Sequence, residues 1–175
     1  MAGDPHVHVN SENEPTVCFD ITDIHLSILN LISDSNTGLR VNGQLFQEGR
    51  HTRLERVYIE SPAGIMVTVT TAGVKIEDSE GVVEIFNYLQ GDELFVTDTY
   101  IQTVSRNEFS KKNGVFVTIP GANGYEIKFH VSVKNGKDSM RFEIIDAKGL
   151  STENLGGIIG ESILPSEYTV DQAKV

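Results

Sequence analysis

The feature that most constrains the fold is an uninterrupted alternation of apolar and polar side chains over residues 125–134. One face would carry Tyr125, Ile127, Phe129, Val131 and Val133, and the other Glu126, Lys128, His130, Ser132 and Lys134. A period of two is the mark of a β-strand with one face on a core and one in solvent. The run therefore predicts a half-buried strand, and it makes His130 an exposed surface histidine rather than a ligand.

Short apolar or alternating runs of this kind recur along the chain, separated by Gly, Asn, Asp and Pro. The predicted strands are Thr16–Ile21, Ser27–Ile32, Arg40–Phe46, Leu54–Glu60, Ile65–Thr70, Val74–Glu77, Val82–Asn87, Leu94–Val104, Gly114–Ile119, Tyr125–Lys134, Met140–Asp146 and Ile158–Ile163. A short helix over Asp20–Leu31 is an alternative for the second of them, because Ile21, Ile24, Ile28 and Leu31 form a helical stripe. We expect an all-β domain, an antiparallel β-sandwich or a barrel.

Small-residue pairs mark the expected turns. Asn135-Gly136 predicts a hairpin into Met140–Asp146, where Phe142 and Ile144 share a face. Asn113-Gly114 and Asn123-Gly124 are expected to bracket a strand, and Ala72-Gly73 to form a tight turn or a bulge.

Charge and composition exclude several classes of protein. The formal net charge of -11 argues against nucleic acid, an anionic membrane surface or a purely ionic complex with a sulfated polysaccharide. No apolar run is long enough to span a membrane. The single Cys18 excludes an internal disulfide framework and is expected to be a small buried hydrophobe. Residues 1–2 read as an added start, residues 3–165 as one domain and residues 166–175 as a tail.

Gly3-Asp4-Pro5-His6 places a labile peptide bond near the start of the chain. The Asp4 carboxylate can attack its own carbonyl to give a cyclic anhydride, and the tertiary amide nitrogen of Pro5 is a good leaving group. His6 titrates near neutrality and can supply the departing nitrogen with a proton. The same four residues also fit a plain Asp-Pro turn.

Other candidate sites have a structural alternative. Asp4, His6 and His8 would share one face of a strand and could hold zinc or a similar ion, whereas the alternative is a polar face on an N-terminal edge strand. Asp34–Gly38 begins like a calcium loop, but Gln44 stands where its glutamate belongs, so a turn is expected. Gly156–Gly160 lacks the lysine of a phosphate loop and predicts close backbone packing at a sheet edge. No constellation for a multi-turnover enzyme is present.

Five blocks of sequence carry a family resemblance. They are Gly3-Asp4-Pro5-His6, Thr16–Ile21, Ile28–Asp34 with Thr37-Gly38, Val41-Asn42-Gly43-Gln44-Leu45, and Phe142–Asp146 running on to Gly156–Gly160. In this order they resemble the C-terminal domain of inter-alpha-trypsin inhibitor heavy chains. The stretch Arg50–Lys112 matches that domain only in its β character.

The resemblance implies a secreted protein whose precursor is cut between Asp4 and Pro5. The freed Asp4 carbonyl would be esterified to the chondroitin sulfate chain of bikunin and then passed to hyaluronan, and the domain after Pro5 would be the part removed. Two features depart from the family pattern, namely Val7 in place of the usual Phe and the absence of a longer C-terminal extension with its cysteine. Gly-Asp-Pro-His also occurs in von Willebrand factor type D modules, but those are rich in cysteine.

A second class of function stays open on the residues alone. An acidic β domain can serve as a non-reactive interaction module that associates with itself or binds a protein or small ligand, with Gly3–His6 as a simple turn. No cofactor is expected in either case.

Overall fold

The computed structural model describes the backbone of residues 6–11, 14–20, 28–48, 51–88, 93–104, 112–134, 139–150 and 155–157. It describes side chains for residues 28–46, 54–88, 93–104, 113–133, 140–150 and 155–157. The strands are β1 (His6–Ser11), β2 (Glu14–Asp20), β3 (Ile28–Asp34), β4 (Leu39–Glu48), β5 (His51–Glu60), β6 (Met66–Thr70), β7 (Val74–Asp78), β8 (Gly81–Phe86), β9 (Glu93–Val96), β10 (Thr99–Val104), β11 (Lys112–Pro120), β12 (Glu126–Lys134), β13 (Ser139–Asp146) and β14 (Leu155–Gly156), with a 3₁₀ turn at Ala122–Gly124.

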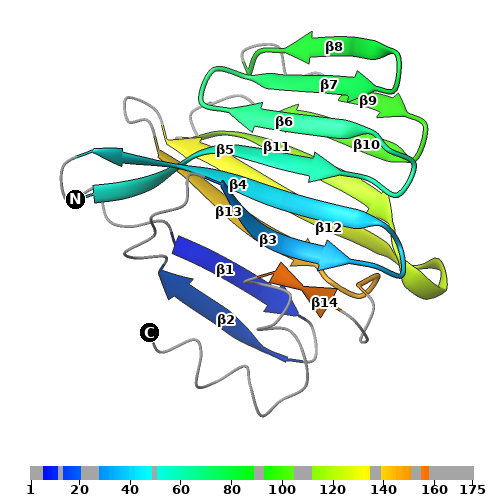
Figure 1. The fold of residues 1–175 in the computed structure, drawn as a ribbon, viewed down its shortest axis with the longest axis horizontal. Helices are drawn as coiled ribbons and strands as arrows, with labels where there is room; N and C mark the ends of the chain where they lie inside the picture. Colours follow the sequence, from blue (N-terminus) through cyan, green and yellow to red (C-terminus); the bar gives the residue numbers. More distant parts are fainter. Residues whose placement is uncertain are drawn as a thin grey trace.

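Two seven-stranded sheets face each other, in the orders β2-β1-β13-β12-β11-β10-β9 and β14-β3-β4-β5-β6-β7-β8. Figure 1 shows them stacked along the line of sight, with β8 and β9 toward one end and β1, β2 and β14 toward the other. Strand neighbours are antiparallel except for β1 and β13, which run parallel. The predicted all-β class is confirmed, and of the two predicted architectures the sandwich is the one observed.

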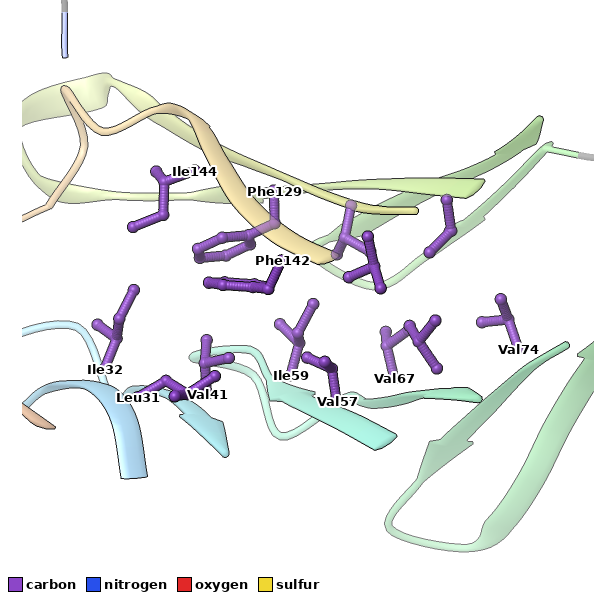
Figure 2. Close-up of a cluster of buried hydrophobic side chains, with 14 of the residues drawn as sticks. Leu31, Ile32, Val41, Val57, Ile59, Val67, Val74, Phe129, Phe142 and Ile144 are labelled. Atoms are coloured by element: carbon purple, nitrogen blue, oxygen red, sulfur yellow. The ribbon is translucent and has the colours of Figure 1, made fainter. Parts of the chain in front are cut away.

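The core lies between the sheets and comes from the alternation seen in the sequence. Ile127, Phe129, Val131 and Val133 of β12 are all buried, and so are Phe142 and Ile144 of β13. Phe129 and Phe142 stack with a centroid distance of 5.5 Å. Figure 2 shows this pair opposed by Val41 and Ile59 of the other sheet. A register shift in β3 next to Leu31 lets both Leu31 and Ile32 enter this core.

Most predicted turns are confirmed. Thr70 and Gly73 close the turn at Ala72-Gly73 through a 2.9 Å backbone hydrogen bond. Asn123 and Gly124 both have positive φ, as a tight turn of this type requires. β12 and β13 pair antiparallel from Lys134 and Ser139 onward, so the predicted hairpin is present, although Asn135-Gly136 itself lies outside the described residues.

The prediction of one strand over Leu94–Val104 is wrong, because Thr97 and Asp98 form a turn that separates β9 from β10. Thr97 has a positive φ of 52°, which is unusual for a β-branched residue. The Asp98 carboxylate accepts hydrogen bonds from the Ser61 hydroxyl at 2.7 Å and the Ala63 amide at 2.9 Å. These contacts hold the turn against the β5–β6 connection of the other sheet.

The predicted turn at Asn113-Gly114 is also wrong, since both residues lie within β11. A Cβ atom on Gly114 would stand 2.8 Å from Nε2 of His130, so glycine here makes room for the imidazole. His130 is half-buried and stacks on Phe116 with a centroid distance of 4.3 Å, rather than being exposed. Tyr125 precedes β12 and is 54% exposed, and Ser132 on the outer face is buried.

The helical alternative for Asp20–Leu31 is wrong at both described ends. Asp20 ends strand β2, and residues 28–31 begin strand β3; residues 21–27 lie outside the described part. Ile158–Ile163 and the tail at 166–175 also lie outside it. Across the described ranges, no helix has the length and apolar character needed to cross a membrane.

Tyr88 anchors the connection that leads from β8 in one sheet to β9 in the other. Its side chain is 3% exposed, and its hydroxyl donates a 2.6 Å hydrogen bond to the backbone oxygen of Thr70. Burial raises the pKa of the Tyr88 phenol far above its usual value, so the hydroxyl stays a hydrogen-bond donor throughout the physiological range.

Replacing Phe142 tests the core. Phe142 is 1% exposed, and Phe142→Ala is expected to lower the free energy of unfolding by about 3–5 kcal/mol, because it removes a ring and leaves a cavity. Phe95, which is 69% exposed, is the matched control, and Phe95→Ala is expected to change the same quantity by less than about 0.5 kcal/mol. Urea denaturation followed by circular dichroism measures both, and equal losses would contradict this account of the core.

Candidate functional site

The predicted cleavage site leads directly into an interior strand of the first sheet. Gly3, Asp4 and Pro5 lie outside the described residues, whereas His6 is the first residue of β1. β1 pairs antiparallel with β2 on one side and parallel with β13 on the other. The expectation of an N-terminal edge strand is therefore wrong, because β2 occupies the edge.

Backbone register assigns neighbours to both histidines of β1. His6 is directly opposite Asp20 of β2. His8 is opposite Cys18 of β2 and in register with Glu143 of β13. Oε1 of Glu143 forms an ion pair with Nε of Arg141 at 3.1 Å. Both residues face away from the core, because Phe142 between them is buried.

The predicted metal set of Asp4, His6 and His8 stays a prediction. Asp4 lies outside the described residues, and the side chains of His6 and His8 are not among those described. Among the described side chains, no group of three or more His, Cys, Asp or Glu is placed to hold a metal ion. The expected buried role of Cys18 likewise stays a prediction.

The block Val41–Leu45 proves to be structural. Val41 and Leu45 are buried on the inner face of β4. Gly43 lies between them, where a Cβ atom would stand 2.8 Å from Cδ1 of Leu54 and 3.2 Å from Cδ1 of Leu31. Glycine is therefore the residue that lets those two leucines meet over the strand.

The two polar residues of the same block link β4 to its neighbours on the outer face. The side-chain oxygen of Asn42 accepts a 2.9 Å hydrogen bond from the side-chain amide of Asn30 in β3. Gln44 accepts a 2.9 Å hydrogen bond from the hydroxyl of Tyr58 in β5. Both faces of the block thus serve packing and strand pairing.

The Asp34–Gly38 segment is a turn, as predicted. The Asp34 carboxylate accepts a hydrogen bond from the Asn36 amide at 3.0 Å, and the Gly38 amide donates to the Asp34 carbonyl at 2.7 Å. Gly38 has a positive φ of 89°, which glycine adopts at little cost. Asp34 therefore organises the β3–β4 turn.

Glycine also allows the close packing predicted for the last block. β14 pairs with β3 at the edge of the second sheet. A Cβ atom on Gly156 would stand 2.6 Å from the Ser33 hydroxyl, and one on Gly157 would stand 2.6 Å from the Leu31 carbonyl oxygen. An open hollow forms at this junction, lined by Ser33, Asp34, Ser35, Gly38, Leu39, Arg40, Leu155 and Gly156.

The blocks that carry the family resemblance, far apart in sequence, converge at one end of the sandwich. Thr16–Ile21 and Phe142–Asp146 contribute β2 and β13, which flank β1. Ile28–Asp34, Val41–Leu45 and Gly156 contribute β3, β4 and β14, which are neighbours in the second sheet. Figure 1 places β1, β2, β3 and β14 together toward the lower end. The strand that follows the predicted cleavage site thus lies among the recognisable blocks.

One polar cluster was missed in the sequence. Ser61 and Thr99 are buried, and both hydroxyls donate hydrogen bonds to Oδ1 of Asp98. The Ser61 hydroxyl also accepts from the Ile65 amide at 3.1 Å. The dipeptides Ser61-Pro62 and Asp98-Thr99 are ordinary turn residues, so nothing in the sequence showed that two separate turns would meet.

Adding a side chain at Gly43 tests the structural role of its block. Gly43→Val is expected to lower the free energy of unfolding by about 1–3 kcal/mol, because Leu31 and Leu54 fill the space above it. Asn42→Val places the same side chain one residue away on the outer face and removes one hydrogen bond, with an expected loss below about 1.5 kcal/mol. Denaturant unfolding measures the free energy of unfolding of both variants. A loss in Gly43→Val no larger than the loss in Asn42→Val would contradict the packing role of Gly43.

Comparison with known proteins finds similarity to inter-alpha-trypsin inhibitor heavy chains. No protein-family model matches the chain, and no solved structure matches it at a significant level. Inter-alpha-trypsin inhibitor heavy chain H1 of Homo sapiens is 27% identical over 180 residues, and that of Bos taurus is 26% identical over 180 residues; each alignment covers 95% of this chain and 19% of the relative. Heavy chain H3 of Bos taurus is 24% identical over 181 residues, covering 96% of this chain and 19% of the relative.

The chain spans about a fifth of the length of the curated relatives that it matches. The similarity runs through β-strands from both sheets, because it covers nearly all of the chain. The resemblance predicted from the five blocks agrees with these relatives. Over almost its whole length, the chain is homologous to one segment of the inter-alpha-trypsin inhibitor heavy chains.

Proposed function

We propose that this chain is a secreted, extracellular domain of the heavy-chain type that presents the Asp4–Pro5 bond for cleavage and ester transfer to a glycosaminoglycan. The acceptor is the chondroitin sulfate chain of bikunin, followed by hyaluronan, as the family resemblance implies. The domain after Pro5 acts as the leaving side in a single event, so it is not an enzyme that turns over. No metal or cofactor is required.

The convergence of the recognisable blocks supports this proposal. β1 begins one residue after Pro5 and is flanked by β2 and β13, two strands that belong to those blocks. The rest of the similarity at this end lies in β3, β4 and β14, whose residues pack rather than react. The candidate cleavage site is thereby followed in the chain by a strand that pairs with two strands of the recognisable blocks.

The chemistry needs only residues 4–6 and an acceptor. The Asp4 side-chain carboxylate attacks the Asp4 backbone carbonyl carbon, and the bond to the Pro5 nitrogen breaks as that nitrogen takes a proton from His6. The products are a five-membered cyclic anhydride on Asp4 and a free secondary amine on Pro5. A sugar hydroxyl then attacks the anhydride, forming an ester at the α-carbonyl and restoring the Asp4 carboxyl group.

The fold suits the leaving side of such a reaction. The strand pairs that the structure describes all lie on the Pro5 side of the bond, and β1 pairs with a strand along each edge. Because these described pairs do not include the residues before Pro5, the domain is expected to stay folded after the transfer.

Replacing Asp4 tests the proposed chemistry. With hydroxylamine present, the wild-type chain is expected to release the peptide of residues 1–4 as its hydroxamate between pH 5 and 8. Asp4→Asn is expected to slow this release by more than about tenfold, because the internal nucleophile is lost. Mass spectrometry measures the intact chain and the trapped peptide.

Asp78→Asn is the matched control, since it removes the same charge at the β7–β8 turn, where Asp78 caps the Glu80 amide at 2.8 Å. Its release rate should equal that of the wild type. Cleavage that Asp4→Asn leaves unchanged would contradict the proposal, as would a wild-type bond that stays intact.

An exposed apolar edge favours a second candidate function, that of a non-catalytic module for self-association. β8 is the edge strand of the second sheet, and it exposes Val82, Val83 and Ile85 at 56%, 41% and 65%. Phe95 of β9, the edge strand of the first sheet, is 69% exposed. Edge strands with exposed apolar side chains are sites at which chains associate.

Charge placed on β8 tests this second candidate. The wild-type chain is expected to form dimers at micromolar concentration, and Val82→Lys combined with Ile85→Lys is expected to leave only monomers in sedimentation-velocity runs. Ile28→Lys, at a residue 53% exposed on β3, is the control and should dimerise like the wild type. A wild-type chain that stays monomeric up to 100-fold higher concentration would exclude self-association.

A further inference from the structure

Asparagine followed by glycine occurs at three places among the described side chains, each in different surroundings. These are Asn42-Gly43 in β4, Asn113-Gly114 in β11 and Asn123-Gly124 in the connection between β11 and β12. Asparagine is a thermolabile residue, and glycine after it adds to the hazard because no side chain shields the glycine nitrogen from the asparagine side chain. The three pairs therefore share one intrinsic reactivity, and their surroundings set how fast each reacts.

Two of the three pairs are held inside a sheet. β4 lies between β3 and β5, and β11 lies between β10 and β12. Both glycines are buried, and a Cβ atom would stand 2.8 Å from Cδ1 of Leu54 at Gly43 and 2.8 Å from Nε2 of His130 at Gly114. Attack on the asparagine side chain requires the glycine nitrogen to turn out of the strand. Paired and crowded strands oppose that motion, because it needs local opening of the sheet.

The third pair lies in open surroundings. Asn123 and Gly124 are both exposed, and a Cβ atom on Gly124 would meet nothing within 4 Å. The backbone bonds of this connection flank the pair, since the Gly121 amide donates to the Tyr125 carbonyl at 2.7 Å and the Tyr125 amide to the Ala122 carbonyl at 3.1 Å. Asn123 can therefore rotate from its ψ of 27° toward the geometry of attack without breaking a strand pair.

We propose that Asn123-Gly124 is a site of spontaneous deamidation in the folded protein, whereas the two pairs within strands are protected. The Gly124 nitrogen attacks Cγ of Asn123, a C–N bond forms, and the side-chain nitrogen leaves as ammonia with the proton of the Gly124 amide. Water then opens the five-membered imide at either of its carbonyls and leaves aspartate or isoaspartate at position 123. Water is the only co-reactant.

The modification changes both the charge and the backbone of the connection. A neutral amide becomes a carboxylate, so the formal net charge of -11 becomes more negative by one unit. Isoaspartate also adds a methylene group to the main chain, next to the point where the Ala122 amide donates to the Gly149 carbonyl at 2.6 Å. The β11–β12 connection is thus the part of the described chain that changes chemically as the protein ages, while the neighbouring strand pairs stay closed.

Peptide mapping of the folded wild-type chain tests the proposal. The chain is incubated at neutral pH and body temperature and then digested with trypsin at each time point. One tryptic peptide, residues 41–50, contains the first pair, and another, residues 113–128, contains the other two. Tandem mass spectrometry then assigns the amide-to-acid mass gain to a residue. We expect Asn123 to deamidate at least about tenfold faster than Asn42 and Asn113, because those two require local opening of a sheet.

The same chain unfolded in urea is the matched control for intrinsic reactivity. There the three rates are expected to lie within about threefold of one another, because the surroundings that distinguish them are gone. A folded chain in which Asn123 deamidates no faster than Asn42 and Asn113 would overturn the proposal. Rates in urea that keep the full difference would overturn it too, since the local sequence and not the fold would then be the cause.

A variant checks the assignment to one residue. Asn123→Gly removes the reactive side chain and keeps a residue that adopts the observed φ of 59° at little cost. Its peptide of residues 113–128 is expected to deamidate at no more than about a tenth of the wild-type rate, because the protected Asn113 pair alone remains in it. An unchanged rate in this peptide would contradict the assignment, and circular dichroism shows that the variant is folded.

Discussion

Burial of apolar side chains between the two sheets is the interaction on which the remaining structure depends. Phe129 and Phe142 on one sheet meet Val41 and Ile59 on the other, and all of them are almost completely removed from water. The apolar area that such a core removes from solvent is the main favourable term in folding. Polar contacts such as Asp98 with Ser61 and Tyr88 with Thr70 then fix how the chain passes from one sheet to the other.

The same core explains why the most recognisable blocks need not be reactive. Val41–Leu45 joins β3, β4 and β5 through Gly43 on the inner face and through Asn42 and Gln44 on the outer face. The identity of its residues is explained by their contacts with neighbouring strands of the sheet. β1, the first described strand, lies outside this block and is held between β2 and β13.

Local patterns in the sequence predicted the local structure well, but they did not predict contacts between segments that are distant in the sequence. Alternation over residues 125–134 predicted the buried face of β12, and Ala72-Gly73 and Asn123-Gly124 predicted their turns. The break at Thr97-Asp98 depends on Ser61 and Ala63 in the other sheet, and Gly114 depends on His130 across the strand pair. The place of β1 between β2 and β13, and with it the neighbour of His6, has no signature in any single window of sequence.

The parallel pairing of β1 with β13 joins the two ends of the described chain, since Val7 is in register with Phe142. During synthesis the first strand leaves the ribosome long before its partner exists. Contacts between such distant segments carry a large loop-closure cost and form late in folding. β1 therefore gains its parallel neighbour only after residues 139–146 have been synthesised, so the completed first sheet depends on a strand that is made long after β1.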